Sequence, residues 1–405
     1  MTQSAAIDSG MVEAPRGRLL QLCAAGALAY CSYAMCRSPL LPLFARELGA
    51  DPPLIGVIVG ASTLTGVVLK LPAGAWSDVL GRRALLVAGA LVFAVMPFTY
   101  LAVSGVGLLI VLRALHGSAT AIFSPVASAA LSDIAPPLRR ATWLSTYSTI
   151  QGAGQAIAPV IAGYLIARGR YDLAFVVAGV IGLSVPVLAW RWPTAPGSRT
   201  GPHALWPQFV RGIQEVIRER LVLVASLAQA AHFLLNGSLS AFFPLYASEV
   251  VGMSAVEIGW MFAVQTVTTL ATRPAIGMLS DRVGRRSVIT TGLVACSAAV
   301  GMISFARSPG SLFVAILVYA AGVAVTTAAT SAFVTDVAPR ARYGAAHGVS
   351  GTIYDVADAA GPLVAGLLVG AWGYAAMFRT MAAAATCIGF TFYWLSRPAA
   401  SSAAG

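Results

Sequence analysis

The sequence predicts an all-α membrane protein in which twelve transmembrane helices form two pseudo-symmetric six-helix bundles. Three observations support this fold class: the chain is strongly apolar, its apolar stretches have spanning length, and its second half repeats its first. Of 405 residues, 58% are hydrophobic and only 10% are charged, and the mean hydropathy is +0.79. Because a soluble domain carries about 25% charged residues, this composition indicates a chain embedded in lipid.

Apolar stretches long enough to cross a bilayer, which takes roughly 20 residues, follow one another along the chain. A transmembrane barrel does not fit, since its strands would alternate apolar and polar residues. Each stretch is therefore predicted to form one spanning helix. The stretches lie near 19–45, 54–77, 84–103, 105–131, 142–168, 172–191, 221–247, 256–279, 287–306, 311–335, 344–368 and 372–395.

The distribution of positive charge predicts the topology. Residues 1–18 are polar and lack the layout of a cleavable signal sequence, so we expect an N-terminal tail. If both termini are cytoplasmic, most Lys and Arg fall in cytoplasmic loops and tails, which is the positive-inside bias. We therefore expect a multi-pass protein of the plasma (inner) membrane, and the net charge of +11 does not indicate a nucleic-acid partner. The basic residues expected outside are Arg46, Arg168, Arg170 and Arg307.

The second half of the chain repeats motifs of the first. The turn GAWSDVLGRR at 74–83 returns as GMLSDRVGRR at 277–286, 203 residues later. The same offset relates LSDIAPPLRR at 131–140 to VTDVAPRARY at 334–343. So long a period indicates duplication of a six-helix unit rather than a solenoid. The predicted domains are an N-terminal tail (1–18), a first bundle (19–191), a linker (192–220), a second bundle (221–395) and a C-terminal tail (396–405).

Within the linker, apolar residues recur at helical spacing between Trp206 and Ile217, with charged residues opposite them. This pattern predicts an amphipathic helix on the cytoplasmic membrane surface that tethers the two bundles.

The doubled G-x-x-x-D-x-x-G-R-R turn, between spans 2 and 3 and again between spans 8 and 9, resembles the Major Facilitator Superfamily of secondary transporters. The resemblance covers nearly the whole chain, because the six-plus-six arrangement of spans fits as well. It implies two six-helix halves around a central site, and transport of a small molecule by alternating access.

Each copy of the turn places an aspartate at the carboxyl end of a helix, where the helix dipole disfavours a carboxylate. Basic residues that can compensate this charge stand beside it and two turns earlier, and glycine permits the tight reversal. The resemblance implies that the aspartates latch the two halves together on the cytoplasmic side. The alternative is a turn that only fixes helix positions. The first copy departs from the family pattern at Val79, where the second has Arg282. The predicted latch residues are Lys70, Gly74, Asp78, Gly81, Arg82, Arg83, Arg273, Gly277, Asp281, Gly284, Arg285 and Arg286.

The fifth span carries GAGQAIAPVIAG at 152–163, which resembles the G-x-x-x-G-P-x-x-G-G pattern of the drug–proton antiporter branch, with alanine at two of the glycine positions. Small residues every fourth position let helices approach closely, and proline bends a helix. Small-residue packing alone would also explain the pattern. The predicted packing and hinge residues are Gly117, Gly154, Pro159, Gly163, Gly361, Pro362 and Gly366.

Ionisable residues inside the predicted spans cost at least about 2.5–3.5 kcal/mol, so they should face a cavity or a partner. Asp355 and Asp358 share one face of span 11, whereas the repeat places Gly152 and Gln155 at these positions in span 5. Adjacent carboxylates disfavour double ionisation, so one aspartate can load and release a proton. The alternative is a static network in which aspartates neutralise arginines. The resemblance associates the arginine of the RALHG sequence in span 4 with proton coupling. The predicted substrate and proton cavity comprises Arg37, Arg113, His116, His232, Asp355 and Asp358.

These observations favour a proton-coupled exporter of a small molecule, either a cationic drug or a carboxylated metabolite or chelate. Two alternatives remain: a proton–solute symporter for uptake, and a membrane sensor or scaffold with a transporter fold. The sequence has no HExxH, GxSxG or GxxxxGK[ST] motif, and its five cysteines lie inside apolar stretches. We therefore expect no enzyme, cofactor or metal. The expected partners of a monomeric chain are substrate, protons and the bilayer.

Overall fold

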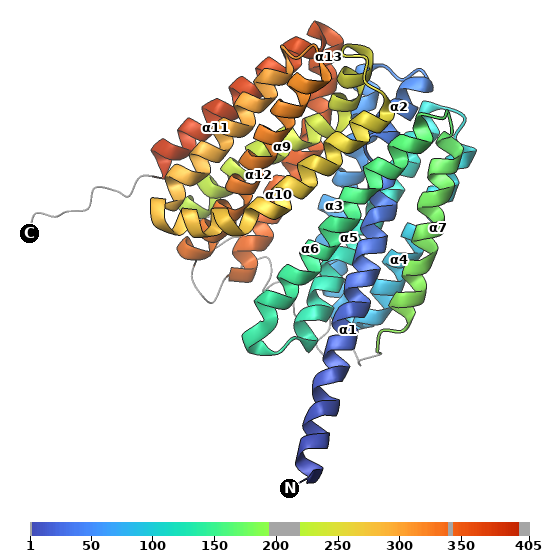
Figure 1. The fold of residues 1–405 in the computed structure, drawn as a ribbon, viewed down its shortest axis with the longest axis vertical. Coiled ribbons are helices and arrows are strands. Elements are labelled where there is room, and N and C mark those ends of the chain that lie inside the picture. The colour runs from blue at the N-terminus through green and yellow to red at the C-terminus, as the bar shows by residue number, and fades with distance from the viewer. Residues whose placement is uncertain (1, 194–218, 339–342, 397–405) are drawn as a thin grey trace, which may run out of the picture. The chain divides into compact units, whose positions relative to one another are not determined.

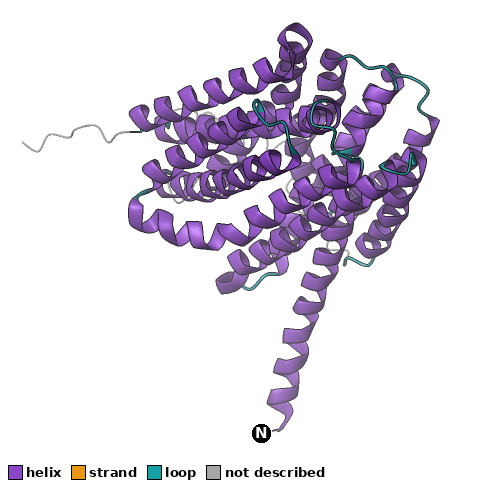
Figure 2. Ribbon diagram, turned by 45° about the horizontal axis from the view of Figure 1, so that its top comes forward, coloured by secondary structure: helices purple, strands orange, loops and turns teal. Residues whose placement is uncertain are grey.

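The computed structural model describes residues 2–193, 219–338 and 343–396, and these residues are helical apart from short connections, with no strand among them (Figures 1 and 2). The predicted amphipathic helix of the linker and nearly all of the C-terminal tail lie outside the described residues. The same holds for the side chains of residues 2–15, 71, 75, 78, 277, 279, 281 and 343–345.

The helices correspond closely to the predicted spans. Two short 3₁₀ turns, Tyr100–Ala102 and Pro137–Arg139, join them at bends. In chain order the α-helices are α1 (Thr2–Met35), α2 (Leu40–Glu47), α3 (Pro52–Leu80), α4 (Arg82–Thr99), α5 (Val106–Ile134), α6 (Arg140–Ile166), α7 (Tyr171–Trp190), α9 (Arg220–Glu249), α10 (Ala255–Val283), α11 (Arg285–Ile303), α12 (Pro309–Val337) and α13 (Tyr343–Leu395).

Nine helical segments of the described residues are long and apolar enough to cross a membrane. The last of them, in α13, contains two spans, because Gly373 has a φ of +79° and interrupts the helical conformation. Helices α6 and α10 have 27 and 29 residues but are more polar, so they fall outside the nine. With these additions, every predicted span has its helix.

The first predicted span differs from the expectation. Helix α1 ends at Met35 and α2 begins at Leu40, so a turn interrupts the stretch. Pro39 lacks a backbone donor and disfavours helical geometry at the residue before it, which explains the break. As a consequence, Arg37 lies in this turn and not inside a helix. At its other end α1 extends back to Thr2, so the segment predicted as a tail is helical from residue 2 onwards.

Contacts among the helices divide the chain into two units. Unit 1 comprises residues 1–49, 64–205 and 254–266, and unit 2 comprises residues 50–63, 206–253 and 267–405. The first part of α3 therefore packs within unit 2, and the first part of α10 packs within unit 1. The predicted bundle boundaries, which place each of these helices in one bundle, remain a prediction.

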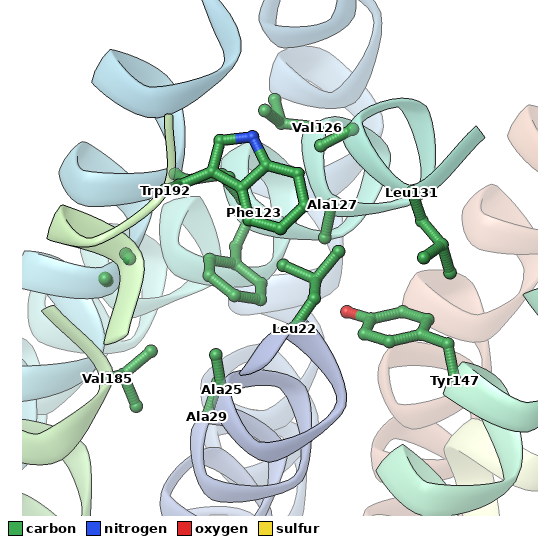
Figure 3. Close-up of a cluster of buried hydrophobic side chains, with 14 of the residues drawn as sticks. Leu22, Ala25, Ala29, Phe123, Val126, Ala127, Leu131, Tyr147, Val185 and Trp192 are labelled. Atoms are coloured by element: carbon green, nitrogen blue, oxygen red, sulfur yellow. The ribbon is translucent and has the colours of Figure 1, made fainter. Parts of the chain in front are cut away.

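The core of unit 1 shows how its helices fit together. Small residues of α1, Ala25 and Ala29, let Phe123 of α5 approach, with Val185 of α7 beside them (Figure 3). Close packing of this kind matters in a membrane, because lipid tails are as apolar as the core and provide no hydrophobic driving force between helices. Figure 1 shows α1, α4, α5, α6 and α7 running alongside one another in this unit.

Candidate functional site

In unit 1, α6 and α10 cross with their backbones in contact. A Cβ atom on Gly163 would lie 2.4 Å from the carbonyl oxygen of Ala255, and one on Gly259 would lie 2.3 Å from that of Pro159. No residue larger than glycine fits either position without moving a helix. Gly163 and Pro159 belong to the predicted packing positions, whereas Gly259 was not predicted.

In unit 2, α3 and α13 make the corresponding crossing. A Cβ on Gly366 would lie 2.6 Å from the oxygen of Pro52, and one on Gly56 would lie 2.4 Å from that of Pro362. Each of these residues is 203 positions from its equivalent in the α6–α10 crossing, in one direction or the other. The sequence repeat therefore produces two matching crossings.

Other predicted packing glycines lie at different helix pairs. A Cβ on Gly154 of α6 would lie 2.3 Å from the oxygen of Ala27 in α1, and one on Gly361 of α13 would lie 2.3 Å from that of Leu234 in α9. Gly117 is buried within α5. The small-residue pattern thus marks contacts inside each unit as well as the two matching crossings.

Two of the predicted cavity residues, Arg113 and His116, form a buried cluster in unit 1. Arg113 is fully buried, and its Nη1 donates to the carbonyl of Cys36 at 3.2 Å and to the hydroxyl of Tyr100 at 3.5 Å. The guanidinium carbon also lies 5.6 Å from the centre of the Tyr33 ring. His116 Nδ1 is 3.1 Å from the Tyr100 hydroxyl, and His116 Nε2 is buried without a hydrogen-bond partner.

The Cys36 carbonyl follows the last turn of α1, where backbone oxygens have no partner inside the helix. Arg113 satisfies this oxygen and thereby attaches α5 to the break between α1 and α2. Arg37, the next residue in the turn, is half-buried. The arrangement fixes the end of α1 beside a buried positive charge.

Asp358 forms the centre of a polar cluster in unit 2. It is 6% exposed and lies on α13, and its carboxylate accepts hydrogen bonds from side chains of two other helices. Asn236 Nδ2 of α9 donates to Oδ1 at 2.9 Å, and Thr63 Oγ1 of α3 donates to Oδ2 at 3.4 Å. The sequence predicted the aspartate but not these two partners, because a lone amide or hydroxyl in an apolar stretch is a weak signal.

His232 of α9 lies in the same region of unit 2. It is 3% exposed, and its ring centre is 6.2 Å from that of Tyr319 in α12. His232 Nδ1 and the Tyr319 hydroxyl are buried without hydrogen-bond partners. Asp355, three residues before Asp358 on α13, is 9% exposed. The predicted cavity residues thus form one group in unit 1 and another in unit 2.

In the first copy of the charged turn, Arg82 links three segments. Its Nε donates to Asp133 Oδ2 at the end of α5 at 3.0 Å, and its Nη1 donates to Ser77 Oγ of α3. Gly81, with a φ of +88°, makes the reversal between α3 and α4. Arg83 stacks on the Trp190 ring, with its guanidinium carbon 4.5 Å from the ring centre.

The second copy repeats this geometry. Arg285 Nε donates to Asp336 Oδ2 at 2.6 Å and Arg285 Nη1 donates to Ser280 Oγ at 2.8 Å, while Gly284 has a φ of +97°. Arg286 bonds to Ser396 Oγ at 2.9 Å and stacks on a tyrosine ring. Asp78 and Asp281 are the two predicted latch aspartates, and their side chains lie outside the described residues. The same holds for the surroundings of Gly277. Of the other predicted latch residues, Gly74 and Lys70 lie in α3, both half-buried, and Arg273 lies in α10.

The acidic partners in both turns are Asp133 and Asp336, which sequence reasoning related through the repeat but did not assign to the latch. Asp133 and Asp336 are 203 residues apart, as are Arg82 and Arg285. This common offset is the sequence signal that identifies the acidic partners.

A hydroxyl-rich face of α6 was not predicted either. An open groove of about 500 Å³ in unit 1 runs beside Thr142, Ser145, Thr146 and Thr149, all exposed. Hydroxyls recurring every three or four residues in a spanning helix are the signal that marks such a face.

Comparison with known proteins shows the family. The model of the Major Facilitator Superfamily matches residues 22–254 and, overlapping them, residues 225–405. An MFS-type transporter of Methanocaldococcus jannaschii is 22% identical over 88% of this chain and 92% of its own length. The multidrug resistance protein MdtG of Escherichia fergusonii is 25% identical over 85% of this chain and 86% of its own. The quinolone resistance protein NorA of Staphylococcus aureus is 24% identical, over 54% of this chain and 56% of its own.

Solved structures share the fold. The nucleoside transporter NupG superposes with a TM-score of 0.78 at 13% identity, covering 94% of this chain and all of that one. A bacterial homolog of the human lysosomal transporter Spinster, inward-facing and unoccupied, gives 0.78 at 18% identity over 94% and 96% of the two chains. These neighbours confirm the predicted all-α fold of two six-helix bundles. They and the relatives are transporters, so the prediction that the chain is not an enzyme is also confirmed. The buried charges, matching helix crossings and doubled turn described above are thus features of a multi-pass membrane protein that belongs to the Major Facilitator Superfamily.

Proposed function

We propose that this transporter exports small molecules in exchange for protons, by alternating access, and that Asp358 carries the proton. The relatives named for multidrug and quinolone resistance support export. The observation on which the proposal depends is the contact of Asp358 with two other helices, α3 through Thr63 and α9 through Asn236.

Protonation of Asp358 would change how α3 is held. The ionised carboxylate accepts a hydrogen bond from Asn236, of a kind that contributes about 1.5–3 kcal/mol. It also accepts a longer and weaker one from Thr63, at 3.4 Å. A protonated carboxyl is a weaker acceptor, so loading a proton loosens the first part of α3 from α13. The second part of α3 belongs to unit 1. Protonation thus changes how tightly the first part of α3 binds to the rest of unit 2. Coupling requires a link of this kind between proton binding and conformation.

Asp358 suits this role better than Asp355. Its carboxylate accepts hydrogen bonds from two neighbouring helices. Asp355 is also buried, at 9% exposed against 6% for Asp358. We assign Asp355, on the same face of α13, to substrate binding.

The hydroxyl-rich face of α6 supports a substrate class of varied structure. Thr146 and Thr149 already donate to backbone carbonyls of α6, but their exposed oxygens still accept hydrogen bonds. Uncharged acceptors of this kind suit drugs of different shapes. Carboxylated metabolites are the other class in this proposal, since the half-buried Arg37 supplies positive charge. We place both termini in the cytoplasm, with the chain acting as a monomer in the inner membrane.

Reconstituted vesicles with an imposed pH difference test the proposal. With a difference of one pH unit, exchange of one proton per neutral substrate predicts about tenfold accumulation. Lipophilic cations and carboxylates are supplied as separate panels. Asp358→Asn should abolish proton-driven accumulation while retaining exchange of labelled for unlabelled substrate, and Asp355→Asn should retain proton coupling.

Three results would contradict the proposal. Full proton-driven accumulation by Asp358→Asn would remove Asp358 as carrier. Accumulation in the same direction as the protons would favour the symporter. Absence of exchange for every compound at every pH would favour a sensor or scaffold.

A further inference from the structure

Unit 2 contains an apolar groove whose lining includes Ala357, the residue before Asp358. It has a volume of about 310 Å³ and opens to the exterior at Leu227, whose side chain is 56% exposed. Of its lining residues only Thr391 has a polar side chain, and that hydroxyl already donates to the carbonyl of Cys387 at 2.8 Å. The groove therefore offers an occupant no free donor, and only the Thr391 oxygen as an acceptor. The lining comes from α9 and α13 and includes Val224, Leu234, Ile388, Phe392 and Leu395.

One end of the groove is positively charged. Arg220 is exposed and lies one turn before Val224 on the same face of α9. Arg286 bonds to Ser396, the residue after Leu395. Helix α9 begins at Arg220, directly after Glu219. The first backbone N–H groups of α9 have no partner within the helix. The two arginines and the helix N–H groups favour an anion at this end and outweigh the single negative charge of Glu219.

The geometry points to a binding site for one anionic phospholipid, whose acyl chain fills the groove while its phosphate lies beside Arg220 and Arg286. The helices that line the groove are long and apolar enough to span a membrane. An occupant with a long apolar chain and an anionic end fits both the lining and the charge. A lipophilic cation fits the lining but is repelled by the two arginines.

Native mass spectrometry of the full-length protein tests the site. The probes are phosphatidylglycerol and phosphatidylcholine of matched acyl length. Leu227→Trp fills the opening, and because Leu227 is largely exposed the substitution leaves the core in place. Leu91→Trp is the matched control, since Leu91 is 50% exposed on α4 in unit 1. Arg220→Gln tests the charged end.

We expect phosphatidylglycerol to bind in preference to phosphatidylcholine, because only phosphatidylglycerol carries a net negative charge to pair with Arg220 and Arg286. Leu227→Trp should weaken phosphatidylglycerol binding at least tenfold, whereas Leu91→Trp should change it less than twofold. Arg220→Gln should remove most of the preference between the two lipids. Thermal stability of each variant in the absence of lipid shows whether it is folded.

Three results would overturn the proposal. Equal affinity for the two lipids in wild type would exclude recognition of the anion. Unchanged binding in folded Leu227→Trp would mean that the lipid sits elsewhere. Stronger binding of a lipophilic cation than of phosphatidylglycerol, lost in Leu227→Trp, would make the groove a drug site.

Discussion

The crossing of α3 and α13 gives a quantitative prediction. In Gly56→Ala the new Cβ would lie 2.4 Å from the Pro362 oxygen, whereas ordinary contact begins at 3.4 Å. The first part of α3 must therefore move by about 1 Å. Overpacking of this kind costs about 1–3 kcal/mol. The Thr63–Asp358 hydrogen bond is already 3.4 Å long, so the shift would break it.

Gly66→Ala is the matched control, because it makes the same substitution on the same helix. Its Cβ would meet only the end of Lys70, at 4.0 Å. Alanine is favoured over glycine in a helix by about 1 kcal/mol, so Gly66→Ala should be neutral or stabilising. Thermal unfolding in detergent and transport by vesicles are measured for both variants. Gly56→Ala should melt at a lower temperature than Gly66→Ala and lose proton-driven transport.

If α3 separates from α13 during transport, a cost of 1–3 kcal/mol shifts that equilibrium by about 5–150-fold towards the separated state. Gly259→Ala, in the matching crossing, should behave like Gly56→Ala. Equal stability and transport in Gly56→Ala and Gly66→Ala would refute the reasoning. The close approach of the two backbones would then make no difference to the free energy of unfolding.

Three further substitutions test other features. Arg82→Asp should slow transport with little change in stability, because its ion pair with Asp133 is partly exposed, with Arg82 20% and Asp133 55% exposed, and contributes about 0–1 kcal/mol. Adding Asp133→Arg should restore the rate measured in vesicles. Arg113→Met should lower thermal stability by about 1–3 kcal/mol, since the buried carbonyl of Cys36 loses its donor, and an unchanged melting temperature would contradict the anchoring role of Arg113. Gly373→Ala should destabilise by about 1–2 kcal/mol, because its φ of +79° disfavours a Cβ; denaturant unfolding measures this, and a stabilised variant would be inconsistent with the break in α13.

The sequence was sufficient to predict the fold because the relevant signals are long and repeated. Every predicted span has its helix, and the doubled turn placed Arg82 and Arg285 at equivalent reversals. The break after Met35 was missed although Pro39 marked it, because the apolar composition continues through the turn. Hydropathy reports burial in lipid and is insensitive to a local change in backbone direction.

The candidate site was less predictable. Asp358 was identifiable because a carboxylate in an apolar stretch is costly, and that cost is visible in one residue. Its partners Asn236 and Thr63 are 122 and 295 residues away in sequence, and neither is unusual by itself. Contacts between distant helices depend on rotation about each helix axis, which a single sequence does not specify. The pairing of Arg82 with Asp133 was closer to prediction, since its repeat at Arg285 and Asp336 constrains both members.

The two matching crossings have a consequence for how such a protein can arise. Gly56 meets Pro362, and Gly259 meets Pro159, so each repeat contributes one glycine and one proline to different contacts. In a two-fold symmetric dimer of a single six-helix chain, residue i meets residue j and residue j meets residue i. One glycine and one proline in such an ancestor would therefore specify both crossings at once. Once the halves are joined in one gene, each crossing can change by itself, and an acidic residue can appear in one copy alone.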